Sequence, residues 1–342
     1  MLSVICPIYN EEKYIGQCVE SILAQDYPKD DLEILFVDGM STDDTRCIVV
    51  NYSNEYPFIK LFDNPKRIVP CAMNIGIKAS KGDIIIRLDA HASYPTNYFS
   101  ALIGRIVELD ADNVGVVCKT DVLNKTPKTL AIREVLSNKF GVGNSVFRTG
   151  VDKVMKVDTV PFGCYRRDTF ERFGMYDERL IRNQDFELNY RIRKGSGRIF
   201  IVPDSNCTYY ARESFKKLWI QNYKNGLWGI RTVLFTGNSN SLALRHYIPM
   251  IFVLSLIVPL FASLLWGPFM GIGGLSLLAY LLMIGGVSFC IAIRKHLNIL
   301  YLLLGFATLH LSNGCGMLVS LFTAKSYVCL LYTSPSPRDM RR

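Results

Sequence analysis

The chain has 342 residues, room for one large domain or two smaller ones, and a formal charge of +9. No charged side chain occurs in residues 248–293 or 296–324, and six basic residues against one acidic residue follow position 247. Residues 1–247 therefore carry 33 basic and 29 acidic side chains. That modest excess argues against a nucleic-acid binder and suits a domain that works beside an anionic membrane.

The first 90 residues alternate apolar strand patterns with amphipathic helix patterns. This alternation predicts a largely parallel sheet with helices on both faces. The expected strands are Leu2–Cys6, Glu33–Val37, Ile59–Phe62 and Ile84–Leu88, and the expected helices are Glu11–Ala24, Thr42–Tyr52 and Pro70–Ala79. Later strands are expected at Val114–Lys119, Lys156–Val160, Arg198–Val202 and Cys207–Ala211, and later helices at Tyr98–Leu109, Arg167–Phe173, Gln184–Arg193 and Phe215–Leu227.

Three apolar segments follow, at Ile248–Trp266, Phe269–Ile293 and Leu297–Phe322. Each is near the roughly 20 residues that a helix needs to cross a bilayer, although a buried helical core is the alternative. Basic residues precede the first segment and separate the second from the third. The positive-inside rule therefore predicts that residues 1–247 lie in the cytoplasm and that the C-terminus lies outside.

The two ends of the chain and its cysteines carry less information. The chain opens on a strand pattern, so we expect no cleavable signal peptide. The ten cysteines show no CxxC or zinc spacing, which favours unpaired thiols. Residues 329–342 form an expected non-native tail, because Cys329–Asp339 resembles the translation of a sequencing-adapter read-through. The natural C-terminus would then be missing.

The segment Asp83–His91 ends a predicted buried strand with two side chains that can bind metals, Asp89 and His91. Residues two apart in an extended segment point to the same side, so both can face one ligand. Open α/β sheets bind ligands at the carboxyl ends of their strands. The pattern therefore indicates an ion anchored by Asp89, against the alternative of a loop carboxylate that caps the next turn.

The first two predicted strands also end in polar residues. Asn10 suits a helix N-cap, and the following Glu11 suits the positive end of that helix. Asp38 is different, because it sits at a strand tip beside the turn residue Gly39. A carboxylate at that place can accept a hydrogen bond from a nucleobase or a ribose hydroxyl.

Five motifs in this order resemble glycosyltransferase family 2. They are Pro7-Ile8-Tyr9-Asn10-Glu11, Val37-Asp38-Gly39, Asn74-Ile75-Gly76, Asp89-Ala90-His91 and Asn183-Gln184-Asp185. The resemblance implies a GT-A catalytic domain over residues 1–230, which is an α/β, Rossmann-like domain with a mostly parallel mixed sheet. A juxtamembrane connection at 231–247 and three transmembrane helices within 248–323 would follow. The Asp-Ala-His motif and these spans are most similar to exopolysaccharide glucosyltransferases of the succinoglycan type.

The resemblance also implies how the donor is held. Four residues would bind the uridine of a UDP-sugar, namely Pro7, Tyr9, Glu11 and Asp38, and Asn74 would lie near the ribose or diphosphate unless it is a helix-surface residue. The family's metal motif is usually Asp-x-Asp, so Asp89 would bind the diphosphate and a Mg²⁺ or Mn²⁺ ion. His91 would either ligate the metal and favour Mn²⁺, or contact phosphate or sugar instead.

The expected catalytic base is Asp185, because displacement at an anomeric carbon needs a carboxylate near the acceptor hydroxyl. The alternative is an ordinary first-turn acid of a helix. Gly163 and Gln184 would lie on the acceptor side. Gln221 and Lys224 occupy the Gln and Arg positions of the Gln-x-x-Arg-Trp pattern of processive synthases, but Lys224 replaces the Arg and no Trp follows directly, which favours one sugar per encounter. They would contact diphosphate or acceptor, or else belong to a helix at the membrane surface.

Together these observations predict a membrane-anchored inverting enzyme in the cytoplasmic membrane. It would move a hexose, glucose first among candidates, from a UDP-sugar to a lipid-linked saccharide hydroxyl in exopolysaccharide or envelope glycan synthesis. Its other partners would be a divalent cation and membrane lipids, and not nucleic acid. One alternative is transfer to polyprenyl phosphate, an acceptor that is already ionised and needs no catalytic base. Another is a non-catalytic, nucleotide-sugar-binding membrane scaffold.

Overall fold

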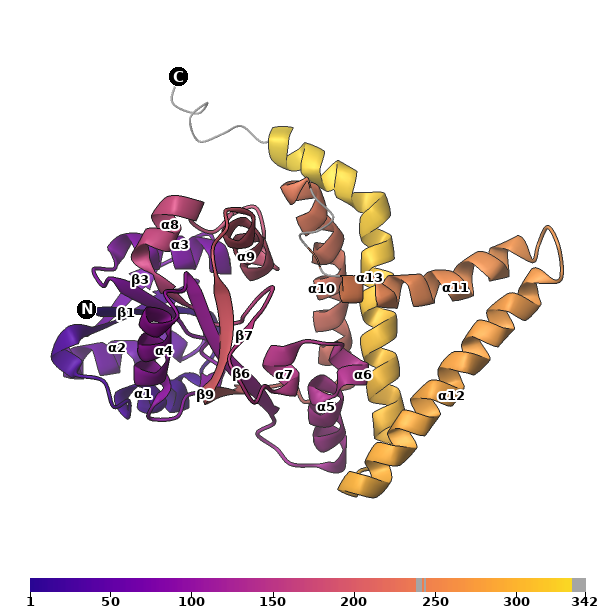
Figure 1. The fold of residues 1–342 in the computed structure, drawn as a ribbon, viewed down its shortest axis with the longest axis horizontal. Helices are drawn as coiled ribbons and strands as arrows, with labels where there is room; N and C mark the ends of the chain where they lie inside the picture. Colours follow the sequence, from indigo (N-terminus) through magenta and orange to yellow (C-terminus); the bar gives the residue numbers. More distant parts are fainter. Residues whose placement is uncertain (238–241, 243, 334–342) are drawn as a thin grey trace. The chain divides into compact units, whose positions relative to one another are not determined.

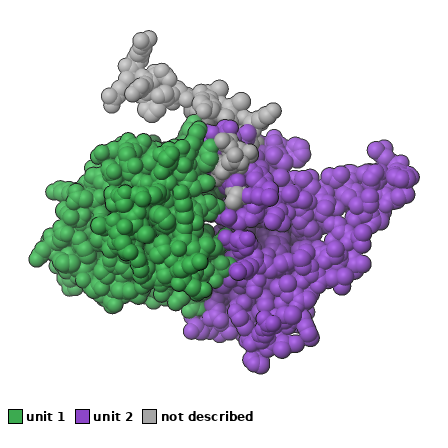
Figure 2. Space-filling view, in the orientation of Figure 1, with its two compact units in different colours: residues 1–121, 145–210 green, residues 122–144, 211–342 purple. Residues whose placement is uncertain are grey.

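The computed structural model describes residues 1–237, 242 and 244–333, with side chains described to residue 323. The chain forms two compact units, which are coloured separately in Figure 2. One unit comprises residues 1–121 and 145–210, and the other comprises 122–144 and 211–342. The domain boundary predicted at residue 230 falls inside helix α10 (Phe215–Thr236). Most of the predicted tail, residues 334–342 and the side chains before them, lies outside the described residues.

The first unit is built on a mixed sheet of nine strands (Figure 1). Its strands are β1 (Leu2–Ile8), β2 (Leu32–Asp38), β3 (Ile59–Asp63), β4 (Ile84–Arg87), β5 (Ala92–Ser93), β6 (Asn113–Asp121), β7 (Met155–Lys156), β8 (Cys164–Arg166) and β9 (Ile199–Tyr210). They lie in the order β3-β2-β1-β4-β8-β6-β9-β5, and β7 pairs with β9. The first four strands are parallel, as is β6 with β9, whereas β5, β7 and β8 run antiparallel to their neighbours.

Helices cover both faces of this sheet, as the strand–helix alternation predicted. All seven residues of β2 are buried, and successive side chains enter opposite layers. Ile34 and Phe36 pack with α1 (Ile15–Leu23), α2 (Thr45–Glu55) and α4 (Tyr98–Glu108). Leu35 and Val37 pack in the other layer with α3 (Val69–Ala79), α8 (Arg167–Phe173) and α9 (Gln184–Lys194). The short helix α7 (Val146–Thr149) completes the unit.

Several strand predictions were wrong in the second half of the sheet. The two strands expected at Arg198–Val202 and Cys207–Ala211 form one strand, β9. Its pairing with β6 skips residues 203–205, where Pro203 has no N–H to donate to the ladder. Of the strand expected at Lys156–Val160, only Lys156 lies in a strand, the two-residue β7. Strand β8 was not predicted, because its three residues are too short to show a period.

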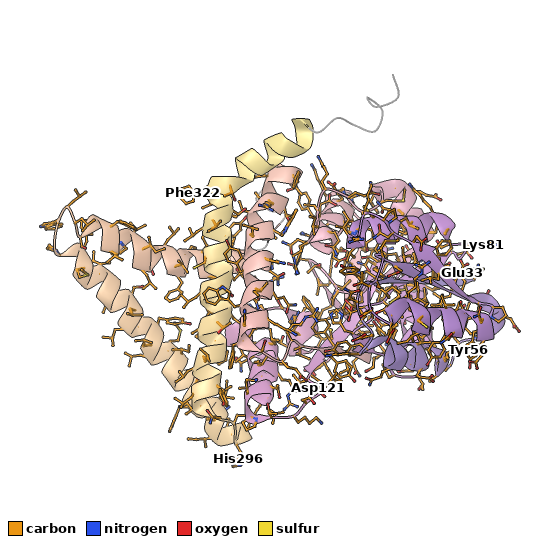
Figure 3. The ribbon with its side chains drawn as sticks, turned by 180° about the vertical axis from the view of Figure 1, so that it is seen from behind. Glu33, Tyr56, Lys81, Asp121, His296 and Phe322 are labelled. Carbon is orange, nitrogen blue, oxygen red and sulfur yellow. The ribbon has the colours of Figure 1, made fainter. Side chains whose placement is uncertain are left out.

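The second unit is helical. Its helices are α5 (Pro127–Ser137), α6 (Lys139–Val142), α10, α11 (Ile248–Ala262), α12 (Phe269–Lys295) and α13 (Ile299–Thr333). Three helical segments are long and apolar enough to cross a membrane, at Leu244–Ala262, Phe269–Lys295 and Ile299–Thr323. This confirms the three candidate spans. Figure 3 labels His296, at the turn between α12 and α13, and Phe322, far along α13, whose side chain is exposed.

Helix α5 was not predicted, although its N-terminus carries a recognisable signal. Thr126 caps it and forms a reciprocal capping box with Thr129, and Pro127 occupies the first turn. The buried face of α5 joins the core of the second unit beside residues of α12 and α13. Glu134 of α5 is buried and pairs with Lys295 at 2.7 Å, so one ion pair connects α5 to the end of α12.

Helix α10 runs to Thr236, nine residues past the predicted end at Leu227, because it packs along α13. Glycines allow this approach: a Cβ on Gly226 would lie 2.1 Å from the carbonyl oxygen of Asn313. A Cβ on Gly316 would lie equally close to the carbonyl oxygen of Tyr223. Small residues therefore bring the two backbones into direct contact, as in many membrane helix pairs.

Candidate active site at the carboxyl ends of the strands

Three parallel strands end at one edge of the sheet and place their loops side by side. Ile8 at the end of β1 pairs with Asp38 at the end of β2, and Ile5 of β1 pairs with Arg87 at the end of β4. Residues that follow these strands therefore meet at that edge, where open α/β sheets bind ligands. The register of these strands thus explains why the residues that follow β1, β2 and β4 lie at the same edge.

The loops after β1 and β2 are joined by hydrogen bonds. The backbone N–H of Asn10 donates to Oγ of Ser41 at 3.0 Å, and that of Thr42 donates to Oδ1 of Asn10 at 2.8 Å. The N–H of Glu11 donates to Oγ1 of Thr45 at 2.7 Å. The N-cap interpretation of Asn10 was wrong, because this residue is left-handed (φ 54°) and α1 begins only at Ile15. Its side chain fixes the neighbouring loop instead.

Asp38 is fully buried and its carboxylate has partners on both oxygens. Oδ1 accepts from the N–H and the hydroxyl of Ser41, at 3.0 and 2.6 Å, and Oδ2 accepts from Arg46 at 3.1 Å. Arg46 also pairs with Asp63 at 2.6 Å. The sequence patterns missed Arg46, which stands in the first turn of α2 with no motif to mark it. The arrangement fixes Asp38 at the strand tip, and its uridine role stays a prediction.

Two further predicted donor residues lie on the same edge. Pro7 is in β1 and pairs with Val37 of β2. Tyr9 is exposed at 44%, and its ring lies so close to Gly39 that a Cβ on that glycine would come within 3.2 Å of it. An exposed aromatic ring packed on a turn glycine is positioned to stack on a planar ligand. Their contact with a nucleobase is likewise untested.

Glu11, Asp89 and His91 come together as one charged cluster. Nδ1 of His91 lies 2.6 Å from Oδ1 of Asp89 and 3.2 Å from Oε1 of Glu11. Burial opposes a charged imidazole, but attraction to Asp89 outweighs it and raises the pKa of His91 well above its usual value. Burial alone would raise the pKa of Asp89, and the imidazolium lowers it. The cluster therefore holds one cation between two carboxylates.

The fit of a divalent cation rests on Asp89. Among the described residues, its Oδ2 makes no hydrogen bond, and its side chain is 21% exposed. Mg²⁺ commonly uses one or two carboxylates together with substrate phosphates, so this oxygen suits it. Nδ1 of His91 is engaged by two carboxylates, and in the described part of the chain no group of three or more His, Cys, Asp or Glu side chains is arranged to hold a metal ion. A protein-only metal cage is therefore absent there, and one carboxylate anchor fits.

Asp185 lies in the first turn of α9 and pairs with a residue that sequence patterns did not single out. Its Oδ1 accepts from Nη1 of Arg87, the last residue of β4. Asn183, directly before α9, is left-handed (φ 62°) and turns the chain into the helix. The guanidinium of Arg87 lies 5.8 Å from the centre of the Phe162 ring. Strand β4, which precedes Asp89, thus also carries the arginine that pairs with the predicted base Asp185.

Asn74 is buried in α3, so the helix-surface interpretation was wrong. Its Nδ2 donates to the carbonyl of Tyr176 at 2.9 Å and to Glu178 at 3.1 Å, and its Oδ1 accepts from the N–H of Tyr176 at 3.0 Å. These bonds hold the segment that precedes α9. Glu178 also pairs with Lys66 at 2.6 Å. A ribose or diphosphate contact by Asn74 stays a prediction.

The remaining predicted residues fall into two places. Gly163 is buried, and a Cβ there would lie 2.3 Å from Oδ1 of Asn113, which indicates a packing role. Gln184 is buried, and its Oε1 has no hydrogen-bond partner among the described residues. Gln221 and Lys224 lie on α10 in the second unit, with Lys224 exposed. The cluster in the first unit is complete without these last two.

Comparison with known proteins identifies relatives that are named for sugar transfer and for succinoglycan biosynthesis. A protein of Methanococcus voltae, named dolichyl N-acetyl-alpha-D-glucosaminyl phosphate 3-beta-D-2,3-diacetamido-2,3-dideoxy-beta-D-glucuronosyltransferase, is 31% identical over 230 residues. The match covers 66% of this chain and 71% of that protein. The succinoglycan biosynthesis protein ExoA of Rhizobium meliloti is 31% identical over 225 residues, covering 65% of this chain and 67% of ExoA.

Solved structures share the fold. The mannosyltransferase PcManGT from Pyrobaculum calidifontis, in complex with GDP-Man and Mn²⁺, superposes with a TM-score of 0.57 at 17% identity, over 94% of this chain and 87% of that one. Residues 1–349 of S. aureus TarS give a TM-score of 0.52 at 16% identity, over 94% and 91%. These similarities confirm the GT-A-like mixed sheet. The family model for glycosyl transferase family 2 matches residues 3–174, just over half of the sequence, and the chain belongs to that family.

Proposed function

We propose that this glycosyltransferase is an inverting enzyme that moves a hexose from a UDP-sugar to a hydroxyl of a lipid-linked saccharide. Glucose is the first candidate, and exopolysaccharide or envelope glycan synthesis is the setting. The observation that carries the proposal is the single sheet edge at which Asp38, the Glu11–His91–Asp89 cluster and the Arg87–Asp185 pair lie. Sugar transfer needs adjacent binding sites for the donor sugar, its diphosphate and the acceptor.

The donor half is assigned to the β1 and β2 loops. Pro7, Tyr9, Glu11 and Asp38 would hold the uridine, and the hydrogen bonds between the two loops support this because they pre-form the binding surface. Asn74 would act near the ribose or diphosphate by holding the segment at Tyr176. These loops are fixed before the donor arrives, which lowers the entropic cost of binding.

Asp89 would hold a Mg²⁺ or Mn²⁺ ion through its unengaged oxygen. The metal would supply positive charge where the departing diphosphate gains negative charge. PcManGT, which shares the fold, was solved with Mn²⁺. Metal ligation by His91 stays a prediction. Nδ1 of His91 contacts both Glu11 and Asp89, which favours its other predicted role, a contact with phosphate or sugar. In that role the imidazole would also orient Asp89.

Asp185 would act as the base. Its carboxylate takes the proton of the acceptor hydroxyl, the acceptor oxygen forms a bond to the anomeric carbon, and the bond from that carbon to the phosphate oxygen breaks. UDP leaves with the electron pair of the broken bond. Attack opposite to the leaving group inverts the anomeric centre. Gln184, next to Asp185 in sequence, and Gly163, whose carbonyl accepts from the N–H of Arg87, would border the acceptor.

The acceptor assignment is supported by the M. voltae relative, whose name specifies a sugar already attached to dolichyl phosphate. The three apolar helices would keep such a lipid within reach, and Gln221 and Lys224 on α10 would contact acceptor or diphosphate. Arg245, Arg294 and Lys295 flank these helices, so the positive-inside rule favours a cytoplasmic catalytic unit in the cytoplasmic membrane.

The test is a donor and acceptor screen. Membranes that contain the full chain are incubated with labelled UDP-glucose or other labelled UDP-hexoses, with Mg²⁺, Mn²⁺ or a chelator, and the labelled lipids are identified. We expect label on a lipid-linked saccharide, abolished by the chelator and reduced about 10²–10³-fold in Asp89→Asn. Label on polyprenyl phosphate itself would support the second candidate. The absence of both transfer and donor hydrolysis would contradict an enzyme.

A matched control variant distinguishes the loss of any carboxylate near β4 from the loss of Asp89 itself. Asp83 directly precedes β4, whereas Asp89 follows it; the Asp83 side chain is 89% exposed and pairs with the N-terminal amine at 3.4 Å. Asp83→Asn should retain wild-type transfer. If Asp83→Asn and Asp89→Asn lose activity equally, Asp89 has no specific role.

A further inference from the structure

Arg87 is a buried cation with one strong partner. Its guanidinium pairs with Asp185, its backbone N–H donates to the carbonyl of Gly163 at 3.0 Å, and its side chain is only 7% exposed. Nε of Arg87 has no hydrogen-bond partner among the described residues. Burying an ion costs several kcal/mol, and an apolar side chain of the same size is often as stable. Fold stability alone therefore gives a weak reason for an arginine at this position.

We infer that Arg87 is a positioning residue for transfer: it holds Oδ1 of the Asp185 carboxylate, so that Oδ2 faces the acceptor hydroxyl. This inference rests on the proposed role of Asp185 as the base. The Asp185 side chain is 24% exposed, so the ion pair is closed on the Arg87 side and open on the other. A base needs that arrangement, because the oxygen bound by arginine cannot also take a proton readily.

The other groups that face Asp185 carry no charge near neutral pH. They are the phenols of Tyr165 on β8 and Tyr176 in the segment before α9. Burial raises the pKa of both phenols, so each stays protonated. Burial alone would lower the pKa of Arg87, but the nearby carboxylates, Asp185 first and Asp89 further off, raise it. Arg87 is thus the one ion-pair partner that the described residues give Asp185.

Helix α9 has a second anchor that does not involve Arg87. One turn beyond Asp185, the fully buried Asn189 donates to Oγ1 of Thr159 and accepts from Nδ2 of Asn113, both at 2.8 Å. Leu188 and Ile192 pack the same helix into the core. Substitution of Arg87 should therefore leave α9 in place and alter the carboxylate, which makes the variant interpretable.

The first test compares kcat and KM of the full chain, with the donor and lipid acceptor that the wild type uses. Arg87→Met removes the group that orients the base, so kcat should fall at least about 10-fold at a nearly unchanged KM for the donor. Arg87→Lys keeps a cation at this place and should recover part of the lost kcat. A raised KM at unchanged kcat in Arg87→Met, or equal losses in Arg87→Met and Arg87→Lys, would overturn the inference.

Donor affinity provides the control for Asp89, which lies two residues from Arg87 in sequence. At neutral pH, UDP affinity of Arg87→Met should stay within a few-fold of the wild-type value, because Asp185 is not part of the proposed metal and diphosphate site. If UDP affinity falls as far as kcat does, Arg87 acts through Asp89 and the inference is wrong. This readout needs no transfer, so it is available even for an inactive variant.

A double-mutant cycle tests the pair independently of activity. Asp185→Asn leaves a buried guanidinium without its counter-ion, so its unfolding midpoint should fall clearly below the wild-type value. Arg87→Met/Asp185→Asn removes both charges and should regain more than half of that loss. Additive losses would contradict the pairing. If Asp185→Asn keeps full transfer, the proposed base is wrong, whereas loss of transfer in Asp185→Asn with unchanged kcat in Arg87→Met removes only the positioning role.

Discussion

Gly163→Ala is the perturbation whose effect follows most directly from the geometry. The new Cβ would lie 2.3 Å from Oδ1 of Asn113 and 2.8 Å from the ring of Tyr165, both closer than real Cβ atoms approach. Neither neighbour can withdraw easily, since Asn113 and Tyr165 are fully buried and Asn113 is bonded to Asn189. The carbonyl of Gly163 also accepts from Arg87 at 3.0 Å. The substitution therefore disturbs the support of α9 and of the predicted base together.

Overpacking of a tight core costs about 1–3 kcal/mol. Since a unit of 150–250 residues loses roughly 2–4 °C per kcal/mol, we expect the unfolding midpoint of Gly163→Ala to fall by about 2–12 °C. Stability and transfer should fall together. The assay is thermal unfolding of the detergent-solubilised full chain beside the lipid-labelling assay, both on the same preparation.

Gly104→Ala is the matched control, because Gly104 lies within helix α4 and a Cβ there meets nothing within 4 Å. It should be neutral or more stable by about 0.5–1 kcal/mol. An unfolding midpoint of Gly163→Ala within about 1 °C of wild type, together with lost transfer, would refute the packing argument. That outcome would instead favour the predicted contact between Gly163 and the acceptor.

Three further predictions concern other parts of the chain. A hydrogen bond from Lys66 lowers the pKa of Glu178 to about 2. The difference in unfolding free energy between wild type and Glu178→Gln should therefore be constant above about pH 5 and vanish as the pH falls toward about 2. Urea unfolding at a series of pH values measures this difference. Arg46→Met removes a bonded cation from a buried carboxylate and should raise KM for the donor several-fold at nearly unchanged kcat; a pure kcat loss would contradict this. Gly226→Ala should lower the unfolding midpoint because its Cβ meets a backbone oxygen at 2.1 Å, whereas Gly286→Ala, with open space around it, should not.

Sequence periodicity predicted the first half of the catalytic unit well, because parallel strands buried on both faces leave a strong apolar signal. β1, β2, β3 and β4 each lie within two residues of their expected bounds. Helix α1 begins four residues late, since Asn10 and Glu11 bond to the next loop, a long-range contact that local propensity does not register. The short strands β7 and β8 depend on pairing partners, so their extent could not be read from local pattern.

The candidate site shows the same division between local and long-range information. Asp89 and His91 could be paired from sequence, because both follow one strand at a spacing of two. Arg87 and Arg46 could not, because their partners Asp185 and Asp38 are reached through the fold rather than through a motif. The only local signal for Arg87 is its place directly after the apolar run Ile84–Ile86, and it went unused because it names no partner.

The central claim is that Asp185 activates a hydroxyl on a lipid-linked saccharide. The most direct measurement is single-turnover transfer of labelled sugar to that lipid by the full chain, for wild type, Asp185→Asn and Asp83→Asn, after each is shown to be folded and to bind UDP. Loss of a general base predicts transfer about 10²–10⁴-fold slower in Asp185→Asn at intact UDP affinity, with Asp83→Asn unchanged. Transfer by a folded Asp185→Asn within a few-fold of wild type would contradict the claim.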